Sequence, residues 1–329
     1  MNRIRLENTV FEGLNNAYVF GADSNTVTLV DTGIATPETR EQLSEGLSSL
    51  GVEFADIDEI LLTHWHEDHA GLAGAIQQAG GATVRAHTAD APIIAREPEA
   101  WEGMLERQRA LLSEWGTPDR AREELLAIIE RNSGFAETPT IEPFEDGERF
   151  STAEGVLEAL HLPGHAAGLS GFVFEGEEGT ELLSGDALLP HYTPNVGGAD
   201  VRVEQPLAQY LRTLERIIGE GFVRAWPGHR DPIADPAGRA REIIVHHRER
   251  TENVVAVLRE HGPADAWTVS AHLFGDLSNI HILHGPGEAY AHLDHLAAHG
   301  IVERTDARYR LLDSEPNLDE LFPTVETTD

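Results

Sequence analysis

The segment from Thr63 to Gly71, THWHEDHAG, places three histidines and two acidic residues within six positions. It follows the apolar run Ile60, Leu61, Leu62, which predicts a short buried strand. Imidazole nitrogens and carboxylate oxygens bind zinc and similar ions at about 2.0–2.2 Å. A loop this rich in both groups predicts a metal site at the end of a strand.

The spacing within this loop divides its side chains between two ions. His64 and His66, two positions apart, can reach one ion from an extended segment. Asp68 and His69 lie past a bend and point to a second ion, and Glu67 is left over. Since an ion of this kind takes about three or four ligands, the loop completes neither site by itself.

Three later positions are candidates for the missing ligands. His165 and His229 each end a PGH tripeptide, and Asp186 ends SGD. A glycine precedes each of the three, and each follows a predicted strand. Glycine lets the backbone approach a crowded centre closely. We therefore expect these side chains to complete the two sites.

Composition narrows the chemistry further. The chain of 329 residues contains no cysteine, which excludes disulfides and zinc-finger sites. Acidic residues number 57 against 24 basic residues, all of them arginine, and the net charge is −33. Molar salt shortens the screening length to about 3 Å, so such a surface favours a halophilic protein in a salt-rich cytoplasm. An acidic protein from a genome that favours arginine codons is the alternative.

Hydrophobic periodicity predicts alternating strands and helices up to about residue 259, interrupted by a helical insert at about 98–131. The insert serves either as a cap for the sheet or as a lid over a pocket. After Gly262 and Pro263, two helices and a hairpin predict a winged-helix domain at 262–313, and an acidic tail follows at 314–329. The longer helices are expected at Pro37–Leu50, Pro206–Ile218 and Asp235–Arg259.

Five motifs in order, LVDTG, THWHEDH, LPGH, SGD and WPGH, resemble those of the metallo-β-lactamase superfamily. The resemblance implies an α+β fold, a four-layered αββα sandwich over residues 1–259, with two metal ions at one edge of the sheets. It implies that Asp31, in LVDTG, supports the ligand loop without binding metal. The implied cofactors are two zinc ions, with iron or manganese as alternatives. The implied ligands are His64, His66 and His165 for the first ion, Asp68, His69 and His229 for the second, and Asp186 between them.

Two neighbouring ions lower the pKa of a bridging water, and the hydroxide so formed attacks a carbonyl carbon or a phosphorus. Hydrolysis is the expected reaction, and Asp68 is the expected catalytic residue because it orients this nucleophile. His191, Tyr192 and Asn195 follow Asp186 closely in the sequence. They line the substrate pocket or pack elsewhere, and both interpretations stay open.

Several additions to the core resemble the glyoxalase II-like and lactamase-beta-2-like branch: the insert, PHYTPN, QYLRTLERI and the winged helix after HHRER. The first group cleaves hydroxyacyl thioesters, and some members of the second cut single-stranded RNA. The segment GEAYAHLDHLAAHG carries Glu288 and Asp294 but no basic residue, which disfavours nucleic acid as a partner. The favoured function is hydrolysis of a small-molecule thioester or ester. Because the chain lacks lysine, a thiol carrier other than glutathione is favoured.

An alternative of another class is a persulfide dioxygenase, which would hold one iron through the positions of His64, His165 and Asp186. No apolar run approaches a membrane span, so a cytoplasmic protein without a membrane partner is expected, and a homodimer is left open. The remaining histidines of the carboxyl-terminal region are expected to lie on the surface or in the core without a metal. They are His246, His247, His272, His281, His284, His292, His295 and His299.

Overall fold

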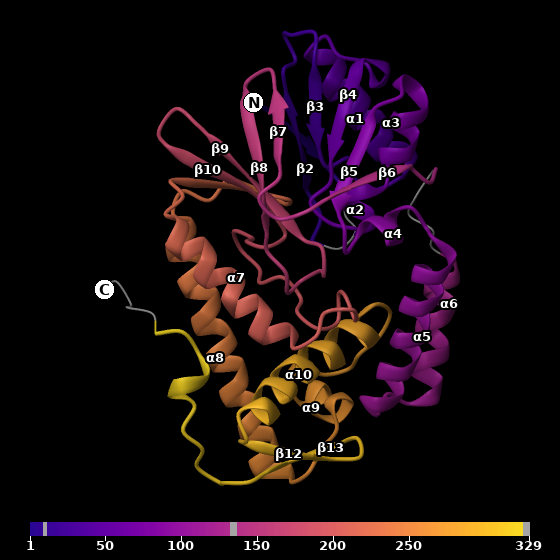
Figure 1. The fold of residues 1–329 in the computed structure, drawn as a ribbon. Coiled ribbons are helices and arrows are strands. Elements are labelled where there is room, and N and C mark those ends of the chain that lie inside the picture. Colours follow the sequence, from indigo (N-terminus) through magenta and orange to yellow (C-terminus); the bar gives the residue numbers. More distant parts are fainter. Residues whose placement is uncertain (9–11, 132–136, 325–329) are drawn as a thin grey trace. The chain divides into compact units, whose positions relative to one another are not determined.

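The structure is a computed structural model that describes residues 1–8, 12–131 and 137–324. It has an α+β fold with mixed sheets and helices (Figure 1). Backbone contacts divide the chain into two compact units, each assembled from three stretches. Unit 1 comprises Met1–Trp101, Ser133–Pro194 and Glu220–Ala237, and unit 2 comprises Glu102–Asn132, Asn195–Gly219 and Gly238–Asp329. The domain boundaries expected from the sequence stay predictions.

The first sheet of unit 1 has the strand order β1-β2-β3-β4-β5-β6. Strands β1, β2 and β3 pair antiparallel, whereas β3 to β6 run parallel. Parallel strands end at the same edge of a sheet, so the loops after β3 and β4 lie together. The strands are Asn2–Leu6 (β1), Asn15–Phe20 (β2), Val27–Val30 (β3), Ile57–Leu61 (β4), Thr83–His87 (β5) and Ile141–Phe144 (β6).

The second sheet of unit 1 has the order β11-β10-β9-β8-β7. Strands β7 to β10 form an antiparallel meander, and β11 joins β10 in parallel. Each of β8, β10 and β11 leads directly into a segment that carries a candidate ligand. The strands are Arg149–Thr152 (β7), Gly155–His161 (β8), Ser170–Glu175 (β9), Thr180–Gly185 (β10) and Arg224–Pro227 (β11).

Alternate side chains of the first sheet fill two different cores. In β2, Ala17 and Val19 pack in a cluster that includes Leu43 of helix α1. Tyr18 and Phe20 point the other way, into a cluster shared with β8, β9 and β10 of the second sheet. This alternation is the period-two pattern of a strand that is buried on both faces. In unit 1 the first sheet therefore has helices on one face and the second sheet on the other.

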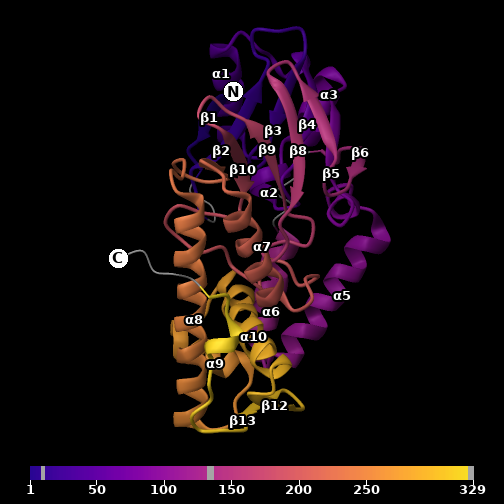
Figure 2. The same ribbon diagram turned by 60° about the vertical axis from the view of Figure 1, so that its left-hand side comes forward.

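The helices of unit 1 are short and follow individual strands. Helix α1 starts where the side chain of Thr36 accepts a hydrogen bond from the backbone N–H of Thr39, and a proline occupies its first turn. Helix α3 contacts β4 and β5, and both ribbon views place it beside them (Figures 1 and 2). The helices are Pro37–Ser49 (α1), Phe54–Asp56 (η1), Glu67–Ala70 (α2), Ala73–Gly80 (α3) and Ala91–Ile94 (α4).

Unit 2 is mainly helical. The stretch predicted as an insert contains two helices, α5 and α6, and α9, α10 and a hairpin follow α8 in the predicted order. Three of the helices begin or end in unit 1. The elements are Pro98–Glu114 (α5), Asp119–Arg131 (α6), Pro206–Glu220 (α7), Pro236–His261 (α8), Ala266–Phe274 (α9), His281–Ala298 (α10), Val302–Thr305 (β12), Arg308–Leu311 (β13) and Asp319–Leu321 (η2).

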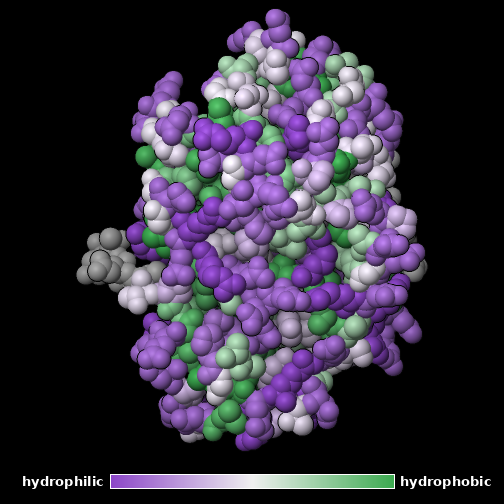
Figure 3. All heavy atoms as spheres, in the orientation of Figure 1, coloured by the Kyte–Doolittle hydropathy of each residue, from purple (hydrophilic) through white to green (hydrophobic). Residues whose placement is uncertain are grey.

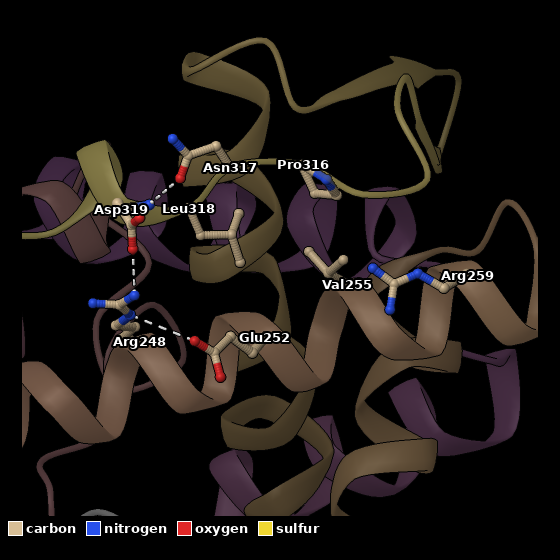
Figure 4. A pocket seen from close by; sticks show the side chains of 8 residues that line it. All are labelled: Arg248, Glu252, Val255, Arg259, Pro316, Asn317, Leu318 and Asp319. Atoms are coloured by element: carbon tan, nitrogen blue, oxygen red, sulfur yellow. Dashed lines mark hydrogen bonds and ion pairs between the residues drawn. The ribbon is translucent and has the colours of Figure 1, made fainter.

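The segment after the hairpin returns along α8 (Figure 4). Arg248 of α8 donates hydrogen bonds to Glu252 on the same helix and to Asp319 in this segment. Leu321 and Phe322 are buried. The predicted acidic tail therefore contributes two apolar side chains to the interior, and its last five residues lie outside the described part of the chain.

Hydrophilic residues cover most of the face in Figure 3, in keeping with the strong excess of acidic side chains. Among the residues that the structure describes, no helix is both long enough and apolar enough to cross a bilayer.

Candidate metal centre

The histidine loop bends between its two pairs of candidate ligands. Thr63 to His66 continue from β4 without helical structure, and His66 has the extended dihedral angles of a helix N-cap (φ −61°, ψ 144°). The short helix α2 then begins at Glu67 and carries Asp68 and His69. The two pairs therefore leave the backbone in different directions.

Three imidazoles form the first ligand cluster. His64 Nε2 lies 2.9 Å from His66 Nδ1, and His165 Nε2 lies 3.1 Å from the same atom. His64 and His165 are buried, and His66 is half-buried. The loop after β4 and the loop after β8 thus bring three nitrogens to one point, although 99 residues separate His66 from His165.

A carboxylate and two imidazoles form the second cluster. Asp68 Oδ2 lies 3.4 Å from His229 Nε2 and 3.9 Å from His69 Nε2. All three side chains are buried. Glu67, from the same loop, belongs to no group of candidate ligands among the described residues.

Asp186 lies between the two clusters. Its Oδ1 is 3.4 Å from His69 Nε2, and its Oδ2 is 3.3 Å from His229 Nε2. The same Oδ2 is 3.7 Å from His165 Nε2, in the first cluster. One carboxylate therefore faces ligand atoms of both clusters.

The donor set fits metal ions. Ligands about 2.1 Å from a tetrahedral ion are separated from one another by roughly 3.4 Å, close to the distances seen here. His69 Nε2 and Asp186 Oδ1 are buried and have no hydrogen-bond partner among the described residues. Orphaned buried polar atoms are rare in folded proteins, and convergent orphans indicate a ligand.

Hydrogen bonds outside the centre fix which ring nitrogen faces the centre in His64, His69 and His229. Asp31 accepts from the N–H and the hydroxyl of Thr63, both at 2.8 Å. The Thr63 oxygen is then free to accept from His64 Nδ1–H at 3.0 Å, which leaves His64 Nε2 unprotonated. His69 Nδ1 donates to Asp31 at 2.8 Å, and His229 Nδ1 donates to the Gly13 carbonyl at 2.9 Å. In each case Nε2 is the nitrogen that faces the centre, and once it is unprotonated it is the atom that binds metal.

Charge differs between the two clusters. Burial would lower the pKa of His69 and of His229, but the facing carboxylates, Asp186 first, outweigh it and raise both pKa values. Burial opposes ionisation of Asp186 too, yet His229 and His69 hold its pKa well below the usual range. In the first cluster, burial and then the neighbouring His69 lower the pKa of His64 far below its usual value. The second cluster therefore attracts positive charge strongly.

Close packing explains two of the glycines that precede ligands. A Cβ at position 228 would lie 2.4 Å from Asp186 Oδ1 and 2.5 Å from His69 Cε1. Gly185 has a φ of +49°, and a Cβ there would lie 2.8 Å from Thr63 Cβ. At these positions any side chain would displace a ligand or the loop that carries it.

Two buried residues that hold the centre have no clear signal in the sequence. Asn15, at the start of β2, donates from Nδ2 to Asp68 Oδ2 at 3.3 Å, and the same nitrogen is 3.5 Å from His229 Nε2. Asp90 accepts from the N–H of Trp65 and of Gly168, both at 3.0 Å. Asp90 thus joins the histidine loop to the loop that carries His165. An asparagine opening a buried strand is a weak hint, and Asp90 follows no pattern.

The expected pocket residues lie in the loop after β10. His191 and Tyr192 are exposed, and the ring of Tyr192 lies 5.1 Å from the guanidinium carbon of Arg230. Asn195 belongs to unit 2, where its Nδ2 donates to Glu288 Oε2 and to the His284 carbonyl, both at 3.1 Å. A role of these three residues in substrate binding stays a prediction.

Comparison with known proteins identifies the family. The sequence model of the Metallo-beta-lactamase superfamily matches residues 10–229, a span that contains every candidate ligand. The chain belongs to this superfamily. With its relatives, the family places the chain among metal-dependent hydrolases.

Individual superfamily members match most of the chain. The probable metallo-hydrolase YqjP of Bacillus subtilis is 30% identical over 292 residues, which cover 87% of this chain and 89% of that protein. The crystal structure of the metallo-beta-lactamase family protein TTHA1429 from Thermus thermophilus has a TM-score of 0.79 at 35% identity, covering 94% and 98% of the two chains. A beta-lactamase domain protein from Burkholderia ambifaria shares the fold, with a TM-score of 0.74 at 22% identity and coverage of 94% and 90%.

Proposed function

We propose that this superfamily hydrolase cleaves a small-molecule thioester or ester at a centre that holds two metal ions. One observation carries the proposal: Asp186 faces the ligand atoms of both clusters at 3.3 to 3.7 Å. Nitrogen and oxygen ligands of this kind suit zinc, and iron or manganese are alternatives. The proposed ligands are His64, His66 and His165 for the first ion, Asp68, His69 and His229 for the second, and Asp186 for both.

When bound, such a pair of ions makes water acidic enough to ionise near neutral pH and polarises a carbonyl oxygen. Asp68 is the proposed catalytic residue. Asn15 donates to its Oδ2 and so fixes the carboxylate, which leaves Oδ1 to accept a proton from the attacking water. Asp31 holds His69 directly and His64 through Thr63, so both rings are oriented before substrate arrives.

The chemistry of the leaving group favours a thioester. A thiol has a pKa of about 8.5, so a thiolate leaves without being protonated first. The reaction then requires a nucleophile and a group that stabilises the developing oxyanion, which are the two functions that the centre offers. The atrochrysone carboxyl ACP thioesterase nsrC of Aspergillus novofumigatus is 24% identical over 311 residues, covering 93% of this chain and 72% of that protein.

The finer assignments are also proposals. We place the chain in the glyoxalase II-like or lactamase-beta-2-like branch because two helices, α5 and α6, are inserted between β5 and β6. The order α9, α10, β12, β13 supports a winged-helix domain, and the shared core of the two sheets supports an αββα sandwich. The net charge of −33 supports a salt-rich cytoplasm as the setting, and it argues against nucleic acid as a partner.

A substrate panel in molar salt, with metal content measured on the same sample, tests the proposal. The wild type should hydrolyse hydroxyacyl thioesters and hold two ions per chain. An Asp68→Ala variant should lose the activity, whereas Asp23→Ala, at an exposed aspartate, should keep it. Rapid cleavage of single-stranded RNA with inert thioesters would show a nuclease instead. One iron per chain with oxygen consumption would show a persulfide dioxygenase.

A further inference from the structure

Unit 2 contains another cluster of potential ligands, made of His247 on α8 and of Glu288 and His292 on α10. All three side chains are buried, with exposures of 0%, 4% and 0%. His247 Nδ1 lies 3.4 Å from His292 Nε2 and 4.0 Å from Glu288 Oε1, and the last two atoms are 3.8 Å apart. Glu288 and His292, four positions apart, occupy the same face of α10.

A neighbouring threonine determines which nitrogen of His292 carries the proton. The Thr251 hydroxyl donates to the His247 carbonyl at 3.0 Å. Its oxygen, 2.7 Å from His292 Nδ1, therefore accepts from Nδ1–H. His292 Nε2 is then unprotonated and directs its lone pair toward His247 and Glu288.

The protonation of His247 also matters for the cluster. His247 Nε2 has no hydrogen-bond partner among the described residues. When Nε2 carries the proton of this ring, Nδ1 is unprotonated and is a second acceptor beside His292 Nε2. Burial lowers the pKa of both His247 and His292 and so favours the neutral form of each ring. Apart from the hydrogen bond that Glu288 Oε1 accepts from Arg250, two imidazole nitrogens and this carboxylate oxygen share at most one proton within 4.0 Å. Such a concentration of acceptors is costly unless a cation lies between them.

Glu288 is held firmly in place. Its Oε2 accepts from Asn195 Nδ2 and from the Val196 N–H, both at 3.1 Å, and its Oε1 accepts from Arg250 Nη1 at 3.1 Å. Each oxygen of a carboxylate has two lone pairs, so Oε1 can still accept a further partner on the side of the histidines. Carboxylates that bind metals in proteins are also held by hydrogen bonds from neighbouring groups, as Glu288 is here.

We propose that His247, Glu288 and His292 bind an additional divalent ion of the zinc type, separate from the centre in unit 1. The distances among their ligand atoms, 3.4 to 4.0 Å, suit an ion held by three ligands at about 2.1 Å. Arg250 offsets the charge of Glu288, so affinity comes mainly from the imidazoles. Imidazole binds zinc, cobalt and nickel well, and magnesium and calcium poorly.

The ion would be structural. It joins α8 to α10 across 41 residues of sequence and satisfies atoms that are otherwise buried without enough protons. The ring of Tyr210 packs edge-on against His247 at 5.5 Å and closes one side of the cluster. Ion binding at this cluster is independent of the substrate and of the number of ions in unit 1.

Metal content per chain tests the inference. The protein is loaded with zinc, dialysed, and compared with a His292→Gln variant prepared in the same way. The variant should hold one ion fewer than the wild type, and His272→Gln, at an exposed histidine, should hold as many as the wild type. When the wild type is loaded with magnesium or calcium in place of zinc, the site in unit 2 should not retain an ion. Equal metal content in His292→Gln and the wild type would overturn the proposal.

A second variant keeps the test decisive if His292→Gln does not fold. Replacing His66, His69 and Asp186 by alanine together removes ligands from both clusters of unit 1 and leaves the three residues of unit 2 intact. This variant should retain one tightly bound zinc or cobalt ion. Retention of none would rule out the unit 2 site whatever the activity of the wild type proves to be.

Discussion

The two ligand clusters of unit 1 arise from one loop but differ in charge. The first cluster contains three imidazoles, and the second contains two imidazoles with the carboxylate of Asp68. Burial with little compensation lowers the pKa of His64, whereas Asp186 and Asp68 raise the pKa of His69 against the same burial. Neighbouring histidines in one sequence motif can therefore have opposite proton affinities, because the side chains opposite them come from other parts of the chain.

The difference in charge between the two clusters should affect which metal ion each one prefers. Neutral imidazoles favour borderline ions such as zinc, whereas added carboxylates also accept harder ions such as manganese. Asp186 couples the two positions since it faces both. We expect the two ions to differ in affinity and in the ease with which they are exchanged.

Removing the shared carboxylate should have the largest effect. In Asp186→Asn the side chain that faces His69, His165 and His229 loses its charge, and an amide NH2 replaces one of its two oxygens. Because a bound ion contributes several kcal/mol to the reaction, loss of about 4 kcal/mol slows hydrolysis roughly a thousandfold. Metal analysis should find at most one ion in the centre of unit 1. Full metal content with unchanged turnover would contradict a shared position.

Replacing Asp31, which supports the histidine loop, should have a smaller effect, and it should lower the affinities for the two ions unequally. Asp31 contacts His69 directly but reaches His64 only through Thr63. Loss of such a supporting hydrogen bond lowers metal affinity by about 10- to 100-fold. In Asp31→Asn we expect the affinity for the second ion to fall more than that for the first, measured by competition with a chelator. Equal losses would mean that Asp31 acts on the loop as a whole.

Lowering the pH should weaken the binding of the two ions to different extents. His69 and His229 have pKa values above the ordinary 6.5, so a metal must displace protons from them already above that pH. The apparent affinity for the second ion should fall about tenfold per pH unit for each displaced proton. His64, with its pKa below 6.5, adds no such fall until the pH is far lower. Chelator competition from pH 8 to pH 5.5 measures both curves, and parallel curves would refute the distinction.

The candidate ligands could be named from the sequence because their information is local, and their role as ligands stays a prediction. Each lies in a short motif after a strand, and Gly228 shows why the motif contains glycine. The roles of Asn15 and Asp90 could not be predicted, because their partners lie far away in the sequence. A sequence also does not show whether a given polar side chain is buried or exposed. The grouping of His247, Glu288 and His292 could not be predicted for the same reason, and the expectation that these histidines bind no metal stays a prediction that our proposal opposes. Hydrophobic periodicity predicts strands in this region, but it does not show which core each face of β2 joins.

The smallest effect is expected at Asn15, which touches only the second cluster. Its Nδ2 donates to Asp68 at 3.3 Å, a long bond to a charged acceptor, so its loss should cost about 1–1.5 kcal/mol, or roughly five- to thirteenfold in kcat. KM should change little if the bond orients Asp68 toward the attacking water without contacting substrate. The variant is Asn15→Ala, with Asn25→Ala at an exposed turn as control. A lower metal content instead of a lower kcat would show that Asn15 supports the second ion and leaves the nucleophile unaffected.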